Sequence, residues 1–314
     1  MSDGEMINPK IEQLNASIKK VILAHLPKAG TLDSQTIDGL RFIRRDENNR
    51  EGAAMAEPSL GFVIQGQKKT FVGGKEYFYG KNHCVVIGVD VPTSYCATKA
   101  TKAEPFLTVS LRLDRVLLVE LIGQLPPQSE SIRAGSAMTV GQMDETLLEA
   151  LWRLVQLVDR PDEAAVLAPM IIREIHFRVL MTPLGDSLRR FCERAGSSSQ
   201  IARAIAWLRQ NYRSSLSVSE LADHVHMGVS TFHRRFKEAT NMTPLQYHKL
   251  LRLHEAKRLM ISENMDATTA CYAVGYESPS QFSREYKREF GQPPYRDVKR
   301  QKSLRKNGFV LGGA

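Results

Sequence analysis

The feature that most constrains this chain is a pair of similar helical segments, about 50 residues apart, in its last third. Each segment carries apolar residues at the i, i+3, i+4, i+7 spacing of a short helix with one buried stripe. These residues are Val218, Leu221, Ala222 and Val225 in the first copy, and Ala267, Ala270, Cys271 and Val274 in the second. An internal repeat of this kind indicates one structural unit used twice.

A short turn and a second helix follow in each copy. Gly275 supplies the positive φ that such a turn needs, and the second helices are expected to start at Ser230 and Ser280, which are good N-caps. Aromatic residues then match at an offset of 50 residues, Phe232 with Phe282 and Phe236 with Tyr286. Each aromatic pair marks a buried face, so the polar residues between them point outward. Helix, turn and helix with a cationic outer face is the pattern of a DNA-binding helix-turn-helix.

The flanking residues fit this interpretation. Ser217 and Glu220 form a capping box at the start of the first unit. Thr243 and Pro244 begin a long helix that runs to about Ile261 and joins the two units as a rod. A supporting helix precedes the first unit and buries Ile201, Ile205, Leu208 and Tyr212.

The net charge of +9 is unevenly distributed. Residues 197–314 hold 19 Lys and Arg against 10 Asp and Glu, whereas residues 1–196 hold 24 of each. The whole excess of positive charge therefore lies with the repeat. This asymmetry favours a polyanionic partner for that segment, with a solubilising basic face as the alternative.

The segment before the repeat changes from strands to helices. Residues 11–26 read as an amphipathic helix, and residues 40–113 hold short β-rich runs with a hairpin at Gly73 and Gly74. Such strands predict a small barrel or sandwich. From Asp114 onward the period is helical, over residues 114–125, 143–158 and 163–180.

These patterns predict an α+β protein of more than one domain. Residues 1–196 are expected to form a sensing and dimerisation domain, with a small β-barrel at about 40–113 and helices at about 114–181. A polar linker is expected at 196–200. Residues 197–302 form the all-α domain with two helix-turn-helix units joined by a long helix, and residues 303–314 a basic tail.

Several function classes find no support in the sequence. Cys84, Cys96, Cys192 and Cys271 are scattered, without metal-ligand spacing. No phosphate-binding loop, nucleophile elbow or metalloprotease signature is present. We therefore expect no catalysis and no cofactor or metal. The chain has no apolar run of bilayer length and no signal peptide, so a cytoplasmic protein without a membrane partner is expected.

Residues 201–298 resemble the DNA-binding region of the AraC/XylS family of bacterial transcription regulators. The second unit carries the strongest likeness, in residues 274–291 (VGYESPSQFSREYKREFG) and the following Pro293 and Pro294. The first unit and the rod carry SELA at 219–222, FHRRFK at 232–237, PLQY at 244–247 and RLHEAK at 252–257. Asn241 and Cys271 depart from the usual Gly and Ala, but both suit their positions because Asn accepts a left-handed cap and Cys is small.

The N-terminal part is similar to the sensor region of one branch of that family, which implies a cupin-like barrel followed by helices. The likeness rests on GFVIQG at 61–66, the glycine hairpin, and IIREI at 171–175. Metal-binding cupins use paired His and a Glu on strands. Here His83 alone lies among the strands, so that metal site is expected to be missing.

Two sets of site residues follow. DNA contacts are expected from the outer faces of the second helices, with base edges read by small polar and Arg side chains and phosphates held by cations: Ser230, Thr231, His233, Arg234 and Lys237 in the first unit, and Ser280, Gln281, Ser283, Arg284, Lys287 and Arg288 in the second. An effector pocket could be lined by Phe62, Tyr79, Cys84 and Tyr95, although the sequence does not say which side of each strand faces inward.

The resulting hypothesis is a sequence-specific transcription regulator that binds double-stranded promoter DNA in successive major grooves and responds to a small organic effector. RNA polymerase is a partner that the family resemblance implies, and a second copy of the chain is a candidate partner through the middle helices. Three alternatives stay open: a cupin-type enzyme fused to a DNA module, a DNA-repair methyl acceptor with such a module, and a nonspecific architectural protein.

Overall fold

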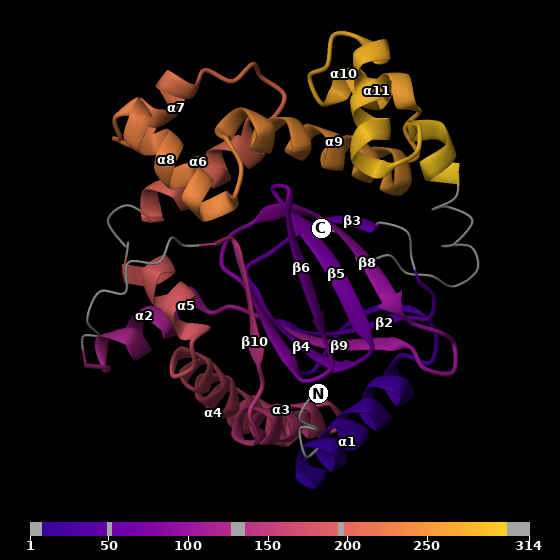
Figure 1. Ribbon diagram of the computed structural model, residues 1–314, viewed down its shortest axis with the longest axis vertical. Coiled ribbons are helices and arrows are strands. Elements are labelled where there is room, and N and C mark those ends of the chain that lie inside the picture. Colours follow the sequence, from indigo (N-terminus) through magenta and orange to yellow (C-terminus); the bar gives the residue numbers. More distant parts are fainter. Residues whose placement is uncertain (1–7, 49–51, 127–135, 194–197, 300–314) are drawn as a thin grey trace, which may run out of the picture.

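The computed structural model describes residues 8–48, 52–126, 136–193 and 198–299. Figure 1 shows three layers: helices of the N-terminal part on one side, β-structure in the middle, and the C-terminal helices on the other side. The β-structure consists of two antiparallel sheets.

The larger sheet has the strand order β1-β2-β9-β4-β7-β10. Its strands are β1 (Gly30–Asp33), β2 (Leu40–Arg45), β4 (Ser59–Gln65), β7 (His83–Ile87), β9 (Phe106–Arg112) and β10 (Met138–Gln142). The smaller sheet has the order β3-β8-β5-β6, with β3 (Gly52–Ala56), β5 (Gln67–Val72), β6 (Lys75–Gly80) and β8 (Val91–Lys99). The hairpin expected at Gly73 and Gly74 joins β5 to β6, and both glycines have positive φ.

Strict alternation gives the larger sheet two different faces. On β4, Leu60, Phe62 and Ile64 join the core cluster that includes the helices α1 (Pro9–His25), α3 (Glu145–Gln156) and α4 (Pro161–Leu180). Gly61 and Val63 on the same strand point to the opposite face, toward the smaller sheet. A hydrophobic layer therefore lies on the outer side of the larger sheet, and the space between the two sheets is lined by the other half of the residues.

The remaining N-terminal helices extend this outer layer. The helices α2 (Arg115–Gly123) and α5 (Gly185–Glu193) pack with α4, and a 3-10 turn, η1 (Leu157–Asp159), links α3 to α4. Local signals predicted α2 and α4 within two residues, since the Asp114 side chain caps α2 by accepting from Leu117 N at 3.0 Å and Pro161 starts α4, whereas α5 was not predicted.

The sequence-based fold is confirmed in class and corrected in detail. The N-terminal region is β-rich with flanking helices and the C-terminal region is helical, but the described strands form two sheets and not one closed barrel. The region after Asp114 is not purely helical, because β10 pairs antiparallel with β7. The expected linker at 196–200 lies partly outside the described residues, and Ser198 to Gln200 form the first turn of a helix.

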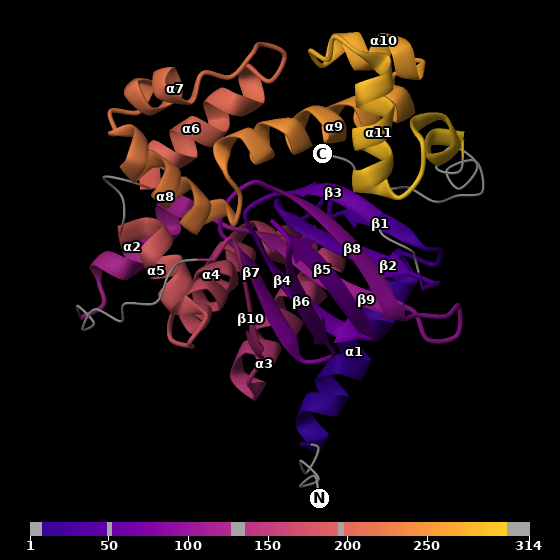
Figure 2. The same ribbon diagram turned by 45° about the horizontal axis from the view of Figure 1, so that its top comes forward.

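The C-terminal helices are α6 (Ser198–Gln210), α7 (Val218–His224), α8 (Val229–Thr240), α9 (Pro244–Ser262), α10 (Ala267–Ala273) and α11 (Pro279–Phe290). Figure 2 shows α9 crossing above β3 and β8, with α6, α7 and α8 at one end and α10 and α11 at the other. The hydrophobic core of the first unit is continuous with that of the β-domain, whereas the second unit has a cluster of its own.

Candidate nucleic-acid interface and interior cavity

The first helix-turn-helix consists of α7 and α8. The Ser217 side chain caps α7 by accepting from Glu220 N at 3.3 Å, which is half of the expected capping box. His226, with φ +56°, makes the turn. The N-cap of α8 is Gly228 and the helix starts at Val229, so the N-cap expected at Ser230 lies two residues too late. Asn241 ends it in the left-handed conformation that was expected.

The second unit repeats this arrangement in α10 and α11. Asp266 caps α10 through bonds from Thr268 N and Thr269 N, and Gly275 turns the chain at φ +88°. The N-cap of α11 is Ser278, whose side chain accepts from Gln281 N at 3.3 Å, and not Ser280 as the sequence suggested. A proline after the cap is favourable at N1, which explains the shift of two residues.

The aromatic pairs of the repeat point inward in both units. Phe232, Phe236, Phe282 and Tyr286 are all buried, and neighbouring rings lie about 5.5 Å apart. The opposite faces of α8 and α11 therefore point outward. Every residue predicted to contact DNA is exposed or half-buried on these faces: Ser230, Thr231, His233, Arg234, Lys237, Ser280, Gln281, Ser283, Arg284, Lys287 and Arg288.

The cations on these faces are largely available to a ligand. Arg234 forms an i, i+4 ion pair with Glu238 at 3.1 Å, yet its side chain stays 62% exposed. No described residue forms an ion pair with Arg284, Lys287 or Arg288. An exposed ion pair of this type contributes little to stability, so a phosphate or a base can displace it at small cost.

The helix α9 holds the two units together through Arg252. Its guanidinium donates to the carbonyl oxygens of Tyr212 at 2.6 Å, Ser214 at 2.8 Å, Gly275 at 2.9 Å and Arg213 at 3.0 Å. Residues 212–214 lie in the loop between α6 and α7, whereas Gly275 lies in the turn of the second unit. Arg252 therefore connects these two segments. This role of Arg252 is not visible in the sequence, because bonds to backbone carbonyls leave no pattern there.

Two further ion pairs fasten the second unit to α9. Lys249 lies 2.5 Å from a Glu285 oxygen, and the Lys257 ammonium lies 2.8 Å from the buried Asp297. Tyr286 also donates to Asp297, at 2.9 Å. These contacts fix α11 relative to the rod.

The first unit is docked on the β-domain. Asn241, at the end of α8, donates to the Tyr77 hydroxyl at 3.1 Å. Arg209 pairs with Asp90 at 2.6 Å, and the Tyr247 hydroxyl donates to the Asp90 carbonyl at 2.9 Å. Burial raises the pKa of the Asp90 carboxyl, and the Arg209 charge partly offsets this. A side chain at Gly73 would collide with the Asn241 backbone, so the β5–β6 turn approaches α8 closely.

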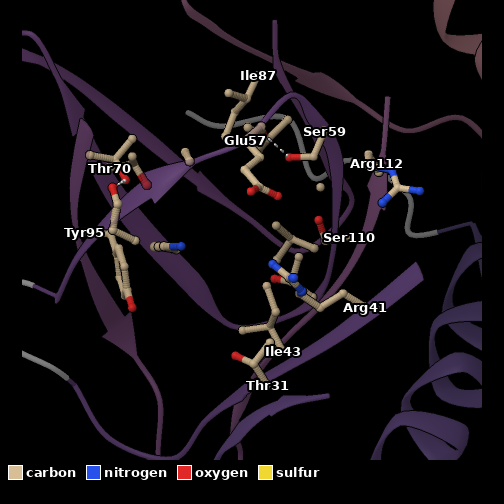
Figure 3. A pocket seen from close by; sticks show the side chains of 18 of the residues that line it. Thr31, Arg41, Ile43, Glu57, Ser59, Thr70, Ile87, Tyr95, Ser110 and Arg112 are labelled. Atoms are coloured by element: carbon tan, nitrogen blue, oxygen red, sulfur yellow. Dashed lines mark hydrogen bonds between the residues drawn. The ribbon is translucent and has the colours of Figure 1, made fainter. Parts of the chain in front are cut away.

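A cavity of about 420 Å³ lies between the two sheets (Figure 3). Its size is that of a site for a small organic molecule. Strands of both sheets line it, including Val63 and Val85 from the larger sheet and Thr70 from the smaller one. The hydroxyl groups of Thr70 and Tyr79 are hydrogen-bonded to each other at 2.8 Å, and burial raises the pKa of Tyr79.

The four residues suggested for an effector pocket divide between two places. Tyr79 and Tyr95 line the cavity. Phe62 and Cys84 lie on the other face of the larger sheet, fully buried in the core with the N-terminal helices. Phe62 is two residues from Leu60 on β4, and Cys84 is two residues from Val86 on β7. Side chains two apart on a strand share a face, so all four lie on the face that the N-terminal helices cover.

The remaining polar candidates have ordinary structural surroundings. His83 lies within 3.0 Å of the Gly80 carbonyl through Nδ1 and 3.2 Å of the Gln142 amide through Nε2. In the described part of the chain, no cluster of three or more His, Cys, Asp or Glu is arranged to hold a metal ion. No helix within the described ranges is long and apolar enough to cross a membrane.

Comparison with known proteins bears on both halves of the chain. A model of the AraC-type transcriptional regulator N-terminus matches residues 36–187, and a helix-turn-helix domain model matches residues 221–300. Together they account for most of the sequence. The chain belongs to the AraC family of transcription regulators.

Relatives in this AraC family agree over most of the chain. The transcriptional activator RhaS from Escherichia coli O1:K1 is 26% identical over 238 residues, which are 76% of this chain and 80% of RhaS. The structure of ToxT from Vibrio cholerae matches with a TM-score of 0.55 at 10% identity, covering 86% of this chain and 95% of ToxT. The second match concerns the fold alone. This AraC-family chain is thus a DNA-binding transcription regulator with a helix-turn-helix domain.

Proposed function

We propose that this regulator binds promoter DNA sequence-specifically, with α8 and α11 in successive major grooves of one face of the duplex. The supporting observation is that both helices present an exposed polar and cationic face while their aromatic pairs are buried. The base-reading residues are Ser230, Thr231, His233 and Arg234 in one groove, and Ser280, Gln281, Ser283 and Arg284 in the next. Lys237, Lys287 and Arg288 hold phosphates.

Binding-site selection with single variants tests this proposal. Arg234→Ala and Arg284→Ala should each cost about 1–3 kcal/mol and relax selectivity at one position each, about one helical turn (~10 base pairs) apart. Lys287→Ala should weaken binding to all sequences about equally and lower the salt dependence. If both Arg variants relax the same base pair, or neither relaxes any, the two-groove arrangement is wrong.

The domain from residue 1 to 196 serves, in this proposal, as a sensor for a small organic molecule. The cavity between the sheets supports it, and ToxT, which shares the fold, has been crystallised with an unsaturated fatty acid bound. The domain from 197 to 302 binds DNA, followed by a basic tail at 303–314. A binding role without catalysis, in the cytoplasm, belongs to the same proposal.

A ligand in the cavity has a short route to the DNA-binding helices. The strands β3 and β8 contribute Met55, Thr93 and Tyr95 to the cavity wall, and both strands also contact α9. A ligand shifts DNA affinity only if it binds two arrangements of this wall unequally, with a coupling of typically ~1–3 kcal/mol. Titration of DNA binding with and without the ligand measures that coupling, and unchanged affinity would contradict it.

A second copy of the chain is the first protein partner that we propose. RNA polymerase is the second, as a partner of the regulator at the promoter. Apolar side chains are exposed along α2 and α4: Val116, Val119, Val166, Leu167, Met170 and Phe177. A groove between these two helices is lined by Leu117, Met170 and Arg173. An exposed apolar face of this kind is typical of a protein interface. Met170→Glu should shift the full chain from dimer to monomer in light scattering, and a wild-type monomer would contradict the proposal.

A further inference from the structure

Two cations of the interior cavity lack a carboxylate partner. Lys68, on β5, and Arg45, on β2, both line it. Arg45 donates to neutral oxygens only, the carbonyls of Gly30 at 2.6 Å and Arg44 at 2.8 Å and the Thr31 hydroxyl at 3.3 Å. The side-chain ammonium of Lys68 forms no hydrogen bond or ion pair with any described residue, although its backbone lies within the sheet. The other arginines of the cavity differ, since Arg41 pairs with Asp33 and Arg112 with Asp38.

Lys68 is held in surroundings that do not favour its charge. Its ammonium lies 4.1 Å from the centre of the Tyr95 ring and 5.9 Å from that of Phe106. Burial, and then the nearby charge of Arg45, lower the pKa of Lys68 to about 7. A charged ammonium without a counter-ion in such surroundings lowers the stability of the ligand-free protein. An anionic ligand would supply the missing counter-ion and remove this cost.

A hydroxyl group of the cavity also lacks a partner. Thr108, on β9, is 8% exposed and lines the cavity, and its Oγ1 has no hydrogen-bond partner in the described structure. The other threonines nearby are satisfied: Thr70 bonds to Tyr79, and Thr93 donates to the Ala54 carbonyl at 3.1 Å. Because buried polar groups are normally paired, the Thr108 hydroxyl marks a position for a ligand oxygen.

The rest of the lining restricts the charge and the shape of the ligand. Val63, Val85 and Ile87 provide an apolar wall on the larger sheet. Three carboxylates, those of Asp33, Asp38 and Glu57, also line the cavity, and the side chains of Asp33 and Asp38 are 64% and 86% exposed at its mouth. Because Arg41, Arg45, Lys68 and Arg112 also line it, the cavity holds one positive charge more than negative charges when Lys68 is protonated, so a ligand with a single negative charge balances it. A single anionic group on an apolar body fits both features.

We propose that the interior cavity binds a small organic monocarboxylate, with its carboxylate on Lys68 and Arg45 and its apolar body along Val63, Val85 and Phe106. The proposal rests on the sensor function proposed above and names the chemical class of its ligand. An ammonium and a guanidinium form charge-assisted hydrogen bonds with a carboxylate, and these are the strong ones in a shielded site. Thr108 supplies a further contact to an oxygen of the ligand.

Binding of matched probes to the full chain tests the class of ligand. The probes are octanoate and benzoate, each with its neutral alcohol, octanol and benzyl alcohol, and octyl phosphate as a doubly charged comparison. Calorimetry on the wild type should show binding of a carboxylate at least ~10-fold tighter than of its alcohol and of the phosphate. Equal affinity for acid and alcohol, preference for the phosphate, or no binding of either carboxylate at millimolar concentration would overturn the proposal.

Variants of two neighbouring lysines on β5 locate the site. Lys68→Gln should weaken carboxylate binding at least ~10-fold and leave alcohol binding unchanged. Lys69→Gln is the matched control, because Lys69 pairs with Glu76 outside the cavity at 2.6 Å and should bind like the wild type. Lys68→Met provides a second test if Lys68→Gln unfolds, and the thermal transition is measured for each. Unchanged carboxylate affinity in a folded Lys68 variant would refute the site.

A DNA titration separates this proposal from the sensor function. A carboxylate that binds through Lys68 without changing DNA affinity supports the anion site and contradicts the sensor function. A neutral molecule that binds in the cavity and changes DNA affinity, when the carboxylates do not bind, supports the sensor function and overturns the anion site. A carboxylate that does both supports the two together.

Discussion

At the scale of single residues, the most unusual one is Lys68, whose ammonium lies without a carboxylate partner in the wall of the cavity. Arg45 on β2, Tyr79 on β6, Tyr95 on β8 and Glu57 in the loop between β3 and β4 line the cavity together with Lys68. The pKa of Lys68 is about 7, against an ordinary value of 10.5. Sites that bind charged ligands often cost stability in the empty state, and replacing such a residue removes that cost.

The stability of the empty protein should therefore depend on pH through Lys68. Between pH 7 and 10.5 the unfolded chain binds the proton more tightly than the folded one, so the penalty is full below pH 7 and fades as the pH rises toward 10.5. Lys68→Met should raise the melting temperature at pH 6.5 clearly more than at pH 9.5. Lys69→Met, measured alongside, should show no such pH-dependent gain. A Lys68→Met protein less stable at pH 6.5 would contradict this.

The conformation and burial of single residues were predictable where a local rule decides them. The left-handed Asn241 and the buried aromatic pairs follow from capping and periodicity. The cavity was predictable only in part: Tyr79 and Tyr95 line it, whereas Phe62 and Cys84 do not. Whether a side chain lines the cavity depends on which face of its strand points away from the helices. That face is known only once it is known which helices cover the sheet. Lys68 was passed over because a lysine on a strand usually faces solvent.

At the scale of elements, long-range pairing explains what the sequence did not reveal. The helices α1, α2 and α9 and the β5–β6 hairpin carry their own caps and turns, and they were predicted within a few residues. The strands β1, β3 and β10 were missed. The strand β10 is a five-residue segment between helical stretches, and its pairing partner β7 lies about 55 residues earlier in the sequence. Such a strand is specified by its neighbour in the sheet and not by its own pattern.

Arg252 acts at this scale, because one side chain on α9 joins a loop of the first unit to the turn of the second. Arg252→Lys keeps the charge but loses the fork of donors, so we expect a loss of about 2 kcal/mol in urea unfolding. Arg258→Lys on the same helix is the control, with a loss below about 1 kcal/mol, because its ion pairs with Glu255 and Glu263 are partly exposed.

The same pair of variants tests the spacing of the two units. The measured quantity is the affinity for a DNA site with one base pair inserted between the two half-sites, divided by the affinity for the uninterrupted site. If Arg252 sets the relative position of the two units, this ratio should be higher for Arg252→Lys than for the wild type. Arg258→Lys should keep the wild-type preference. Equal spacing preference in all three proteins, together with a clear loss of stability in Arg252→Lys, would limit Arg252 to a role in folding.

At the scale of the whole molecule, the boundary between the β-domain and the helix-turn-helix region is a packed interface. Apolar residues of the β-domain and of the first unit form one cluster, whereas the second unit forms its own. The charge split in the sequence marks where the basic segment begins, but it carries no information on this docking. The β-domain contacts α8 through the β5–β6 turn and α9 through β3 and β8, whereas α11 is held on α9 by the ion pair of Lys249 with Glu285.

Asn241 offers a way to loosen this interface without disturbing the helix. Glycine accepts the left-handed conformation that Asn241 adopts at φ +60°, so Asn241→Gly should keep the end of α8 intact. It removes the bonds to the Tyr77 and Ser136 hydroxyls, worth about 1 kcal/mol each. Undocking of the first unit should therefore become up to ~30-fold more frequent. Hydrogen exchange of the amides in the β5–β6 turn and the last turn of α8 should accelerate accordingly.

Asn264→Gly is the matched control, because Asn264 also has a left-handed backbone, at φ +58°, and no described side-chain bond to the β-domain. It should leave exchange at the β5–β6 turn unchanged. If DNA binding requires the first unit to leave the β-domain, Asn241→Gly should also tighten DNA binding of the full chain, since DNA then no longer has to break those bonds. Faster exchange with unchanged DNA affinity would mean that the docked arrangement itself binds DNA, and unchanged exchange would mean that Asn241 does not hold the two parts together.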